Sequence, residues 1–164
     1  MTKILQKDDI VRGMTLINAS ADQVYDIVSD IRRIPEWSPE CIHAEWTAPG
    51  RFRGSNRRRL GRWSTEARIV AAEPGRQFSF AVQMGGSDFT QWTYRMEPAD
   101  AGCQLVEEMR MCVDLPVLAL LFERLALRIK DRRSDLQGNI DQSLCRLRQI
   151  VESEHYGLRR DDPQ

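Results

Sequence analysis

The stretch RQFSFAVQMGGSDFTQWTYRME, residues 76–97, alternates apolar and polar side chains on both sides of a glycine pair. Alternation with a period of two is typical of a strand with one buried and one solvated face. The Gly85–Gly86 pair is a turn signal. The stretch therefore predicts a β-hairpin. Its apolar face carries Phe78, Phe80, Val82 and Met84 from the first strand, and Thr90, Trp92, Tyr94 and Met96 from the second.

The same period extends in both directions from this hairpin. Residues 41–113 contain six strand candidates separated by turn signals such as EPGR and DAG, and VRGMTLI near the start is a seventh. Short turns between consecutive strands predict antiparallel pairing. The last of the six candidates places Leu105, Glu107, Met109, Met111 and Val113 on one face.

Helical spacing appears at two places outside the strands. Ser20 with Gln23 forms a capping box before SADQVYDIV, and Pro35 and Pro39 limit the next helical piece to a short turn around Trp37. Beyond Pro116, apolar residues recur every three or four positions to residue 153, which predicts one long amphipathic helix with a soft point at Gly138.

These elements bury their apolar faces in one simple way. A curved antiparallel sheet of about seven strands wraps around the long C-terminal helix, with two short helices at one end and a cavity between sheet and helix. We therefore expect an α+β fold in a single domain over residues 1–155, followed by a flexible tail over residues 156–164.

Composition excludes several functions. The 164 residues carry 24 basic and 24 acidic side chains, so the formal net charge is zero and disfavours nucleic-acid binding. No secretory signal or apolar run of membrane-spanning length is present, which predicts a cytoplasmic protein without membrane insertion. The four cysteines lack CxxC spacing, so we expect no metal and no dissociable cofactor. A monomer or weak dimer is expected.

The segment RFRGSNRRRLGRW, residues 51–63, holds six arginines in thirteen residues. We interpret it mainly as a solvated hairpin face balanced by acidic neighbours such as Glu45, Glu66 and Glu73. The alternative is a binding patch. An acidic acyl carrier protein would then fit better than a nucleic acid, because the segment lacks interleaved aromatic residues for base stacking.

Several phrases in this order resemble the START-like, or SRPBCC, superfamily, and within it the polyketide cyclase/dehydrase and lipid-transport group with its birch-pollen-allergen-like helix-grip fold. They are INASADQVYDIVSDIRRIPEWSPEC, FRGSNRRRLGRW, EPGRQFSF, WTYRMEP and the closing helix, and the resemblance covers residues 11–154. It implies a cavity that accommodates an apolar small molecule. Members include lipid carriers, aromatic polyketide cyclases and enediyne self-resistance proteins.

The alternation and the resemblance together identify residues that we expect to contact the ligand. The alternative is that these residues only fill the core, which is the usual role of aromatic and methionine side chains on alternating strand positions. The expected ligand-binding residues are Trp37, Phe78, Phe80, Val82, Met84, Thr90, Trp92, Tyr94, Met96, Met109, Met111, Phe122, Leu125 and Ile129.

Catalysis would need further groups. Cyclisation of a polyketide requires a proton relay and a cation or hydroxyl that stabilises an enolate. The resemblance implies an arginine, a tyrosine and a serine or threonine for these roles. The available residues are Tyr94, Thr90, Glu107 and either Arg68 or Arg57.

Glu107 and Tyr94 are the candidate catalytic pair. The alternation places the Glu107 carboxyl among apolar side chains, where desolvation raises its pKa. The alternatives are that Glu107 pairs with an arginine of a neighbouring strand or that a bulge turns it outward. On the strand RWSTEARIVAAE, either Thr65 and Ala67 or Glu66 and Arg68 face inward.

Three functions remain open from the sequence. The first is a protein that binds a hydrophobic small molecule, such as a polyketide or lipid, as a carrier or for self-resistance. The second is an aromatase/cyclase-like enzyme of polyketide biosynthesis. The third is an interaction module whose cavity is collapsed.

Overall fold

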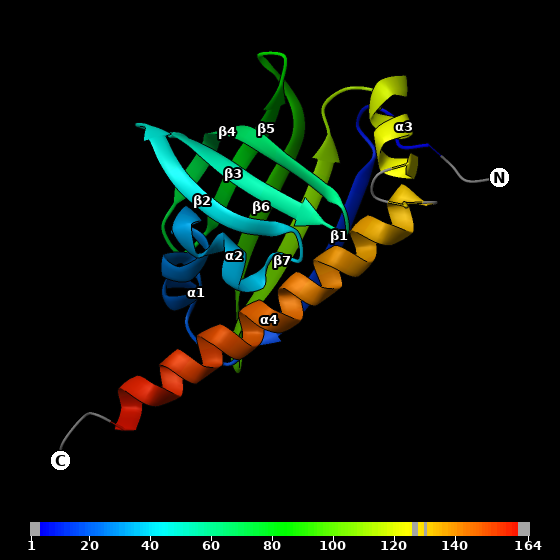
Figure 1. Cartoon of the computed structure of the whole chain (residues 1–164). Helices are drawn as coiled ribbons and strands as arrows, with labels where there is room; N and C mark the ends of the chain where they lie inside the picture. Colours follow the sequence, from blue (N-terminus) through cyan, green and yellow to red (C-terminus); the bar gives the residue numbers. More distant parts are fainter. Residues whose placement is uncertain (1–3, 126–127, 130, 161–164) are drawn as a thin grey trace.

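A curved seven-stranded antiparallel sheet dominates the computed structural model, which describes residues 4–125, 128–129 and 131–160 (Figure 1). The spatial order is β1-β7-β6-β5-β4-β3-β2, so β1 and β2 are the two edges. The strands are β1 (Ile10–Ile17), β2 (Cys41–Ala48), β3 (Arg51–Arg58), β4 (Gly61–Glu73), β5 (Gln77–Met84), β6 (Ser87–Ala99) and β7 (Gly102–Met111). The α+β helix-grip fold expected from the sequence is confirmed.

Two short helices cover one end of the sheet. Helix α1 (Ala21–Val28) begins with the expected capping box, in which the Gln23 N–H donates to Ser20 Oγ at 3.2 Å. A 3₁₀ turn (Ile31–Arg33) leads into α2 (Ile34–Trp37). The buried residues of α1 pack above β5 and β6, where Tyr25 meets the Phe78 ring edge-on at 6.5 Å between centroids.

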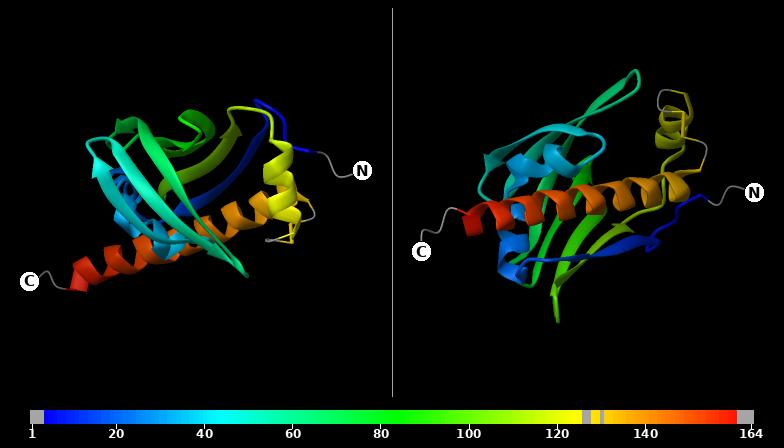
Figure 2. Two further views of the ribbon diagram at one scale, coloured as in Figure 1. Left: turned by 45° about the horizontal axis from the view of Figure 1, so that its top comes forward. Right: turned by 90° about the horizontal axis from the view of Figure 1, so that it is seen from below.

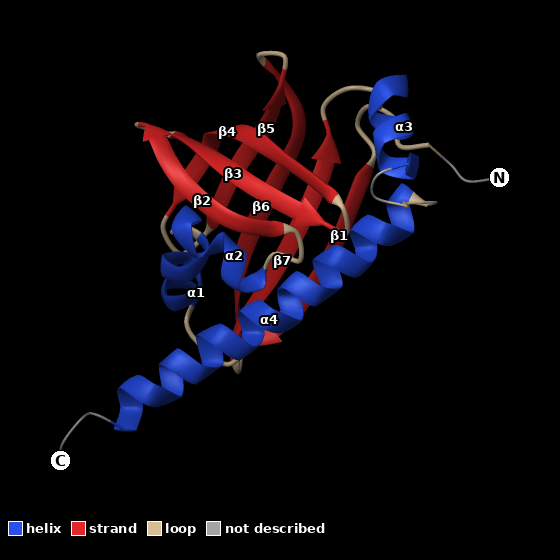
Figure 3. Cartoon of the chain, viewed as in Figure 1, coloured by secondary structure: helices blue, strands red, loops and turns tan. Residues whose placement is uncertain are grey.

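The sequence predicted one continuous helix after Pro116, and this is wrong in one respect. The segment forms two helices, α3 (Val117–Leu125) and α4 (Arg132–Arg160) (Figure 3). Asp131 explains the new start: its Oδ1 accepts from the N–H groups of Arg133 and Ser134 at 3.1 and 3.3 Å, as an N-cap does. Helix α4 continues through Gly138 and includes residues 156–160, which the sequence assigned to the tail.

Helix α4 lies along the open side of the curved sheet (Figure 2). Arg133 and Gln137 each donate to a carbonyl of the β1 edge, at 3.0 Å, so this edge is covered. The approach is close at Gly13, where a Cβ would lie 3.0 Å from side-chain carbons of Ile140 and Leu144.

The arginines of residues 51–63 do not act together. Arg53 pairs with Glu66 on the outer face at 2.6 Å, as the solvated-face interpretation expects. Arg58 instead reaches across to α4 and pairs with Asp135 at 2.5 Å and with Glu40 at 3.1 Å. Arg58 therefore connects the β3–β4 hairpin to the long helix through an ion pair.

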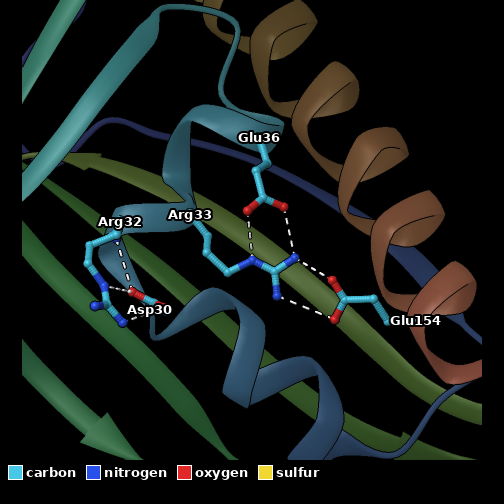
Figure 4. A network of polar contacts seen from close by, with 5 residues as sticks. All are labelled: Asp30, Arg32, Arg33, Glu36 and Glu154. Carbon is cyan, nitrogen blue, oxygen red and sulfur yellow. Dashed lines mark hydrogen bonds and ion pairs between the residues drawn. The ribbon is translucent and has the colours of Figure 1, made fainter. Parts of the chain in front are cut away.

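A second set of ion pairs connects the segment around α2 to α4 (Figure 4). The Arg33 guanidinium contacts both oxygens of Glu36 at 2.8 Å and reaches Glu154 of α4 at 2.5 Å. Arg32, its neighbour, bonds to Asp30 within the same turn. Arg33 thus connects segments 121 residues apart in sequence, whereas Arg32 makes a local contact.

We expect the substitution Arg33→Gln to lower the free energy of unfolding by roughly 1 kcal/mol, because it removes a partly buried guanidinium shared by two carboxylates. Urea denaturation measures this difference. The matched control is Arg32→Gln, for which we expect no measurable loss, because the Arg32–Asp30 pair is solvent-exposed. Equal losses for both variants would contradict the proposed role of the long-range contact.

Candidate functional site

A cavity of about 1060 Å³ lies between the concave face of the sheet and the helices. Strands β3 to β7 form its walls, α2 and α4 line one side, and α3 contributes leucines. The side chains around it are mainly apolar, which is the character of a site for a hydrophobic small molecule.

Three buried side chains of the cavity lining form a chain of hydrogen bonds. The indole Nε1 of Trp37 donates to the Tyr94 hydroxyl at 3.4 Å, and the Tyr94 hydroxyl donates to Glu107 Oε1 at 3.0 Å. Strand pairing places Tyr94 directly opposite Glu107 on β6 and β7. All three residues are part of the cavity lining.

Glu107 is buried, with 2% of its surface exposed. Burial raises the pKa of its carboxyl to about 8; the Tyr94 hydrogen bond acts in the opposite direction, and the Asp141 carboxylate adds to the rise. Burial, and then the Glu107 charge, raise the pKa of the Tyr94 phenol well above its usual value. A carboxyl with such a pKa exchanges its proton near neutral pH.

The two alternatives considered for Glu107 do not hold. Its side chain points inward, and among the described residues its hydrogen-bond partner is Tyr94, not an arginine. Arg68 pairs with Asp88, and neither Arg68 nor Arg57 belongs to the cavity lining. The structure therefore brings Glu107 and Tyr94 together but leaves both candidate arginines elsewhere.

The structure places most of the expected ligand-binding residues around the cavity. The lining includes Trp37, Phe80, Val82, Met84, Thr90, Trp92, Tyr94, Met109, Met111 and Leu125. Phe78 and Met96 are buried but do not line it, because α1 covers this end of β5 and β6. Ile129 is buried outside the lining, and the side chain of Phe122 lies outside the described residues.

Other lining residues were missed from the sequence. Phe52, Gly54 and Asn56 of β3 face the cavity, opposite Ala67, Thr65 and Trp63 of β4. The inward face of β4 is therefore the one with Thr65 and Ala67. A clear signal existed for β3, since Phe52 and Gly54 alternate with arginines. Asn139 and Ser143 add a polar stripe from α4 that helical spacing from Leu136 could have identified.

The described residues bear on metal binding and on membrane spanning. They include no group of three or more histidine, cysteine, aspartate or glutamate side chains placed to hold a metal ion. In the same part of the chain, every helix is too short or too polar to cross a bilayer.

Comparison with known proteins supplies the wider context. The family described as polyketide cyclase / dehydrase and lipid transport matches residues 10–152. No curated protein matches the chain.

Solved structures share the fold. The Polyketide_cyc-like protein Cgl2372 from Corynebacterium glutamicum is 30% identical, with 92% of this chain and 95% of that chain covered and a TM-score of 0.60. A START superfamily protein from Mycobacterium smegmatis is 19% identical over 86% and 98% of the two chains, with a TM-score of 0.61. DynU16, from the dynemicin biosynthetic locus, is 19% identical over 90% of this chain and 48% of its own, with a TM-score of 0.61.

Proposed function

Because this chain belongs to the polyketide cyclase/dehydrase and lipid transport family, we propose that it binds a hydrophobic small molecule in the cavity, as a carrier or a sequestering protein. The observation that carries the proposal is the cavity itself, with about 1060 Å³ bounded mainly by apolar side chains. This volume disfavours an interaction module with a collapsed cavity. Neither Arg57 nor Arg68 is in the lining, and Arg132, which is, pairs with Asp135; this arrangement favours a carrier over a cyclase.

A thermal-shift screen tests the proposal. The panel contains fatty acids, sterols, planar aromatic polyketides, and enediyne-like and flavonoid scaffolds, and mass spectrometry checks each bound compound for chemical change. We expect at least one class to raise the melting temperature and to be recovered unaltered, because a ligand that binds only the folded state stabilises it. No shift across the panel would contradict the proposal.

Ligand binding should be blocked by filling the cavity. We expect Val82→Trp to weaken binding of the best ligand at least about tenfold, because a large ring then occupies space that Val82 leaves to the cavity. The matched control is Val70→Trp, the same change at an exposed position of β4 outside the lining. Isothermal titration of both variants measures the effect, and equal affinities would place the ligand outside this cavity.

The Tyr94–Glu107 pair favours a second candidate function, an aromatase/cyclase-like enzyme that needs no cofactor. Glu107 would transfer the proton and the Tyr94 hydroxyl would hold the carboxyl in place. The exposed arginines Arg57, Arg59 and Arg62 offer a basic surface for an acyl carrier protein that delivers the substrate. A chemically altered ligand in the screen, and loss of that product in Tyr94→Phe with retained binding, would support this candidate.

A further inference from the structure

One buried polar atom beside the cavity has no partner. Among the described residues, Glu107 is the one acidic or basic residue that is buried, and its Oε2 makes no hydrogen bond. The other buried polar pair of the sheet, Ser79 and Thr93, is satisfied by a mutual hydrogen bond of 2.9 Å. Unpartnered buried polar atoms are rare in folded proteins. Glu107 Oε2 therefore requires an explanation.

The direction of the hydrogen bonds determines what Oε2 can do. An indole N–H only donates, so Trp37 uses an acceptor lone pair of the Tyr94 hydroxyl. The Tyr94 proton is then directed to Glu107 Oε1, which acts as an acceptor. If the carboxyl is neutral, its own proton lies on Oε2. In that state Oε2 is a hydrogen-bond donor without an acceptor.

The surroundings of Glu107 favour the neutral carboxyl. Across the sheet, β1 presents Gly13 and β6 presents Tyr94. Helix α4 contributes the negative charge of Asp141, α2 contributes Trp37, and the Cys41 thiol is near Tyr94. None of these described groups is a cation that would stabilise a carboxylate. Burial acts in the same direction and raises the pKa of Glu107 to about 8.

We propose that the ligand carries a ketone-type carbonyl oxygen and that neutral Glu107 donates a hydrogen bond to it from Oε2. Oε2 is inaccessible in this conformation, so a ligand reaches it when the carboxyl turns about its terminal torsion, which is soft in glutamate. A hydrocarbon would leave the donor unpaired, and sites built to hydrogen-bond reject analogues that lack the partner. An anionic ligand would meet the negative field of Asp141. This inference rests on the proposed ligand-binding function and specifies its ligand class.

The test uses two ligands of one shape, 9-fluorenone and fluorene, which differ by a carbonyl oxygen. Their dissociation constants are measured by displacement of Nile red from the full chain. We expect fluorenone to bind about tenfold more tightly than fluorene at pH 6, the usual scale for one such hydrogen bond. At pH 9.5 we expect the ratio to fall toward one, because ionised Glu107 cannot donate.

Three variants identify the group responsible. Glu107→Gln keeps an N–H donor, so we expect the preference for fluorenone to persist at both pH values. Glu107→Leu removes the donor and should bring the ratio close to one. The control Glu108→Gln changes the adjacent residue, which pairs with Arg95 away from the cavity, and should leave the pH-dependent ratio unchanged.

The outcomes separate this inference from the proposed function. Equal binding of fluorenone and fluorene to the wild type would overturn the carbonyl inference and leave the proposed function standing. Binding of neither compound would count against both. Infrared spectra give a measurement that needs no variant: we expect the carbonyl stretch of bound fluorenone to lie below its value in hexane, and an unshifted stretch would overturn the inference.

Discussion

Replacing Gly102 with alanine is expected to destabilise the protein by roughly 2 to 5 kcal/mol, through backbone strain and steric overlap together. Gly102 begins β7 with φ at +134°, a conformation that side chains rarely adopt. An added Cβ would lie 2.2 Å from the carbonyl oxygen of Ile17 and 3.0 Å from the backbone nitrogen of Ala19. These are backbone atoms, and the adjacent pairing of Ile17 with Cys103 holds them in place. The midpoint of urea denaturation measures the loss.

Gly50→Ala is the matched control for this substitution. Gly50 also has positive φ, at +69°, but a Cβ there would meet nothing within 4 Å. We expect a loss of about 1 kcal/mol from the left-handed conformation alone. Losses of similar size for both variants would show that backbone conformation, and not the contact with β1, determines the effect.

The stability of the protein should fall with rising pH because of Glu107. An acid with a higher pKa in the folded state binds its proton more tightly there. Its contribution to the free energy of unfolding is full below the ordinary glutamate pKa of 4.5, decreases as the pH rises to about 8, and is constant above that. One pKa unit corresponds to about 1.4 kcal/mol, so the full difference is roughly 4 to 5 kcal/mol. This is the largest effect of one ionisable group that we expect.

Glu107→Gln isolates this contribution from that of other acids. The amide occupies the same space and does not ionise. We therefore expect the wild type to lose stability relative to the variant between pH 5 and pH 8, measured by denaturation at a series of pH values. Parallel curves for the two proteins would contradict the assigned protonation state. Glu108→Gln, with its side chain on the other face of β7, should leave the wild-type pH dependence largely intact.

Much of the fold followed from local pattern. The alternation in residues 76–97 predicted β5 and β6, and the Ser20–Gln23 pair predicted the start of α1. The break before α4 was missed, because the leucines on both sides keep helical spacing. Asp131 followed by Ser134 was the available signal for a new helix start. An N-cap contributes only about 1 kcal/mol, so this signal alone does not distinguish two helices from one uninterrupted helix.

The sequence predicted which side chains of the candidate site face inward, but not which of them reach the cavity. Alternation indicated that Glu107 faces inward, because successive side chains on a strand point to opposite faces. It gave no information on which inward residues reach open space. Phe78 and Phe80 share a face, yet α1 covers Phe78 while Phe80 lines the cavity. The covering helix comes from a distant part of the sequence.

The amino-acid sequence by itself determined the elements, the inward face of most strands and the family resemblance, because these depend on spacing between near neighbours. Only the tertiary structure decided that Tyr94, not an arginine, faces Glu107, and that Trp37 completes the chain. Those contacts depend on strand register and on how α2 and α4 pack over the sheet. Register depends on turn geometry as well as on the hydrophobic pattern, so alternation alone does not specify it.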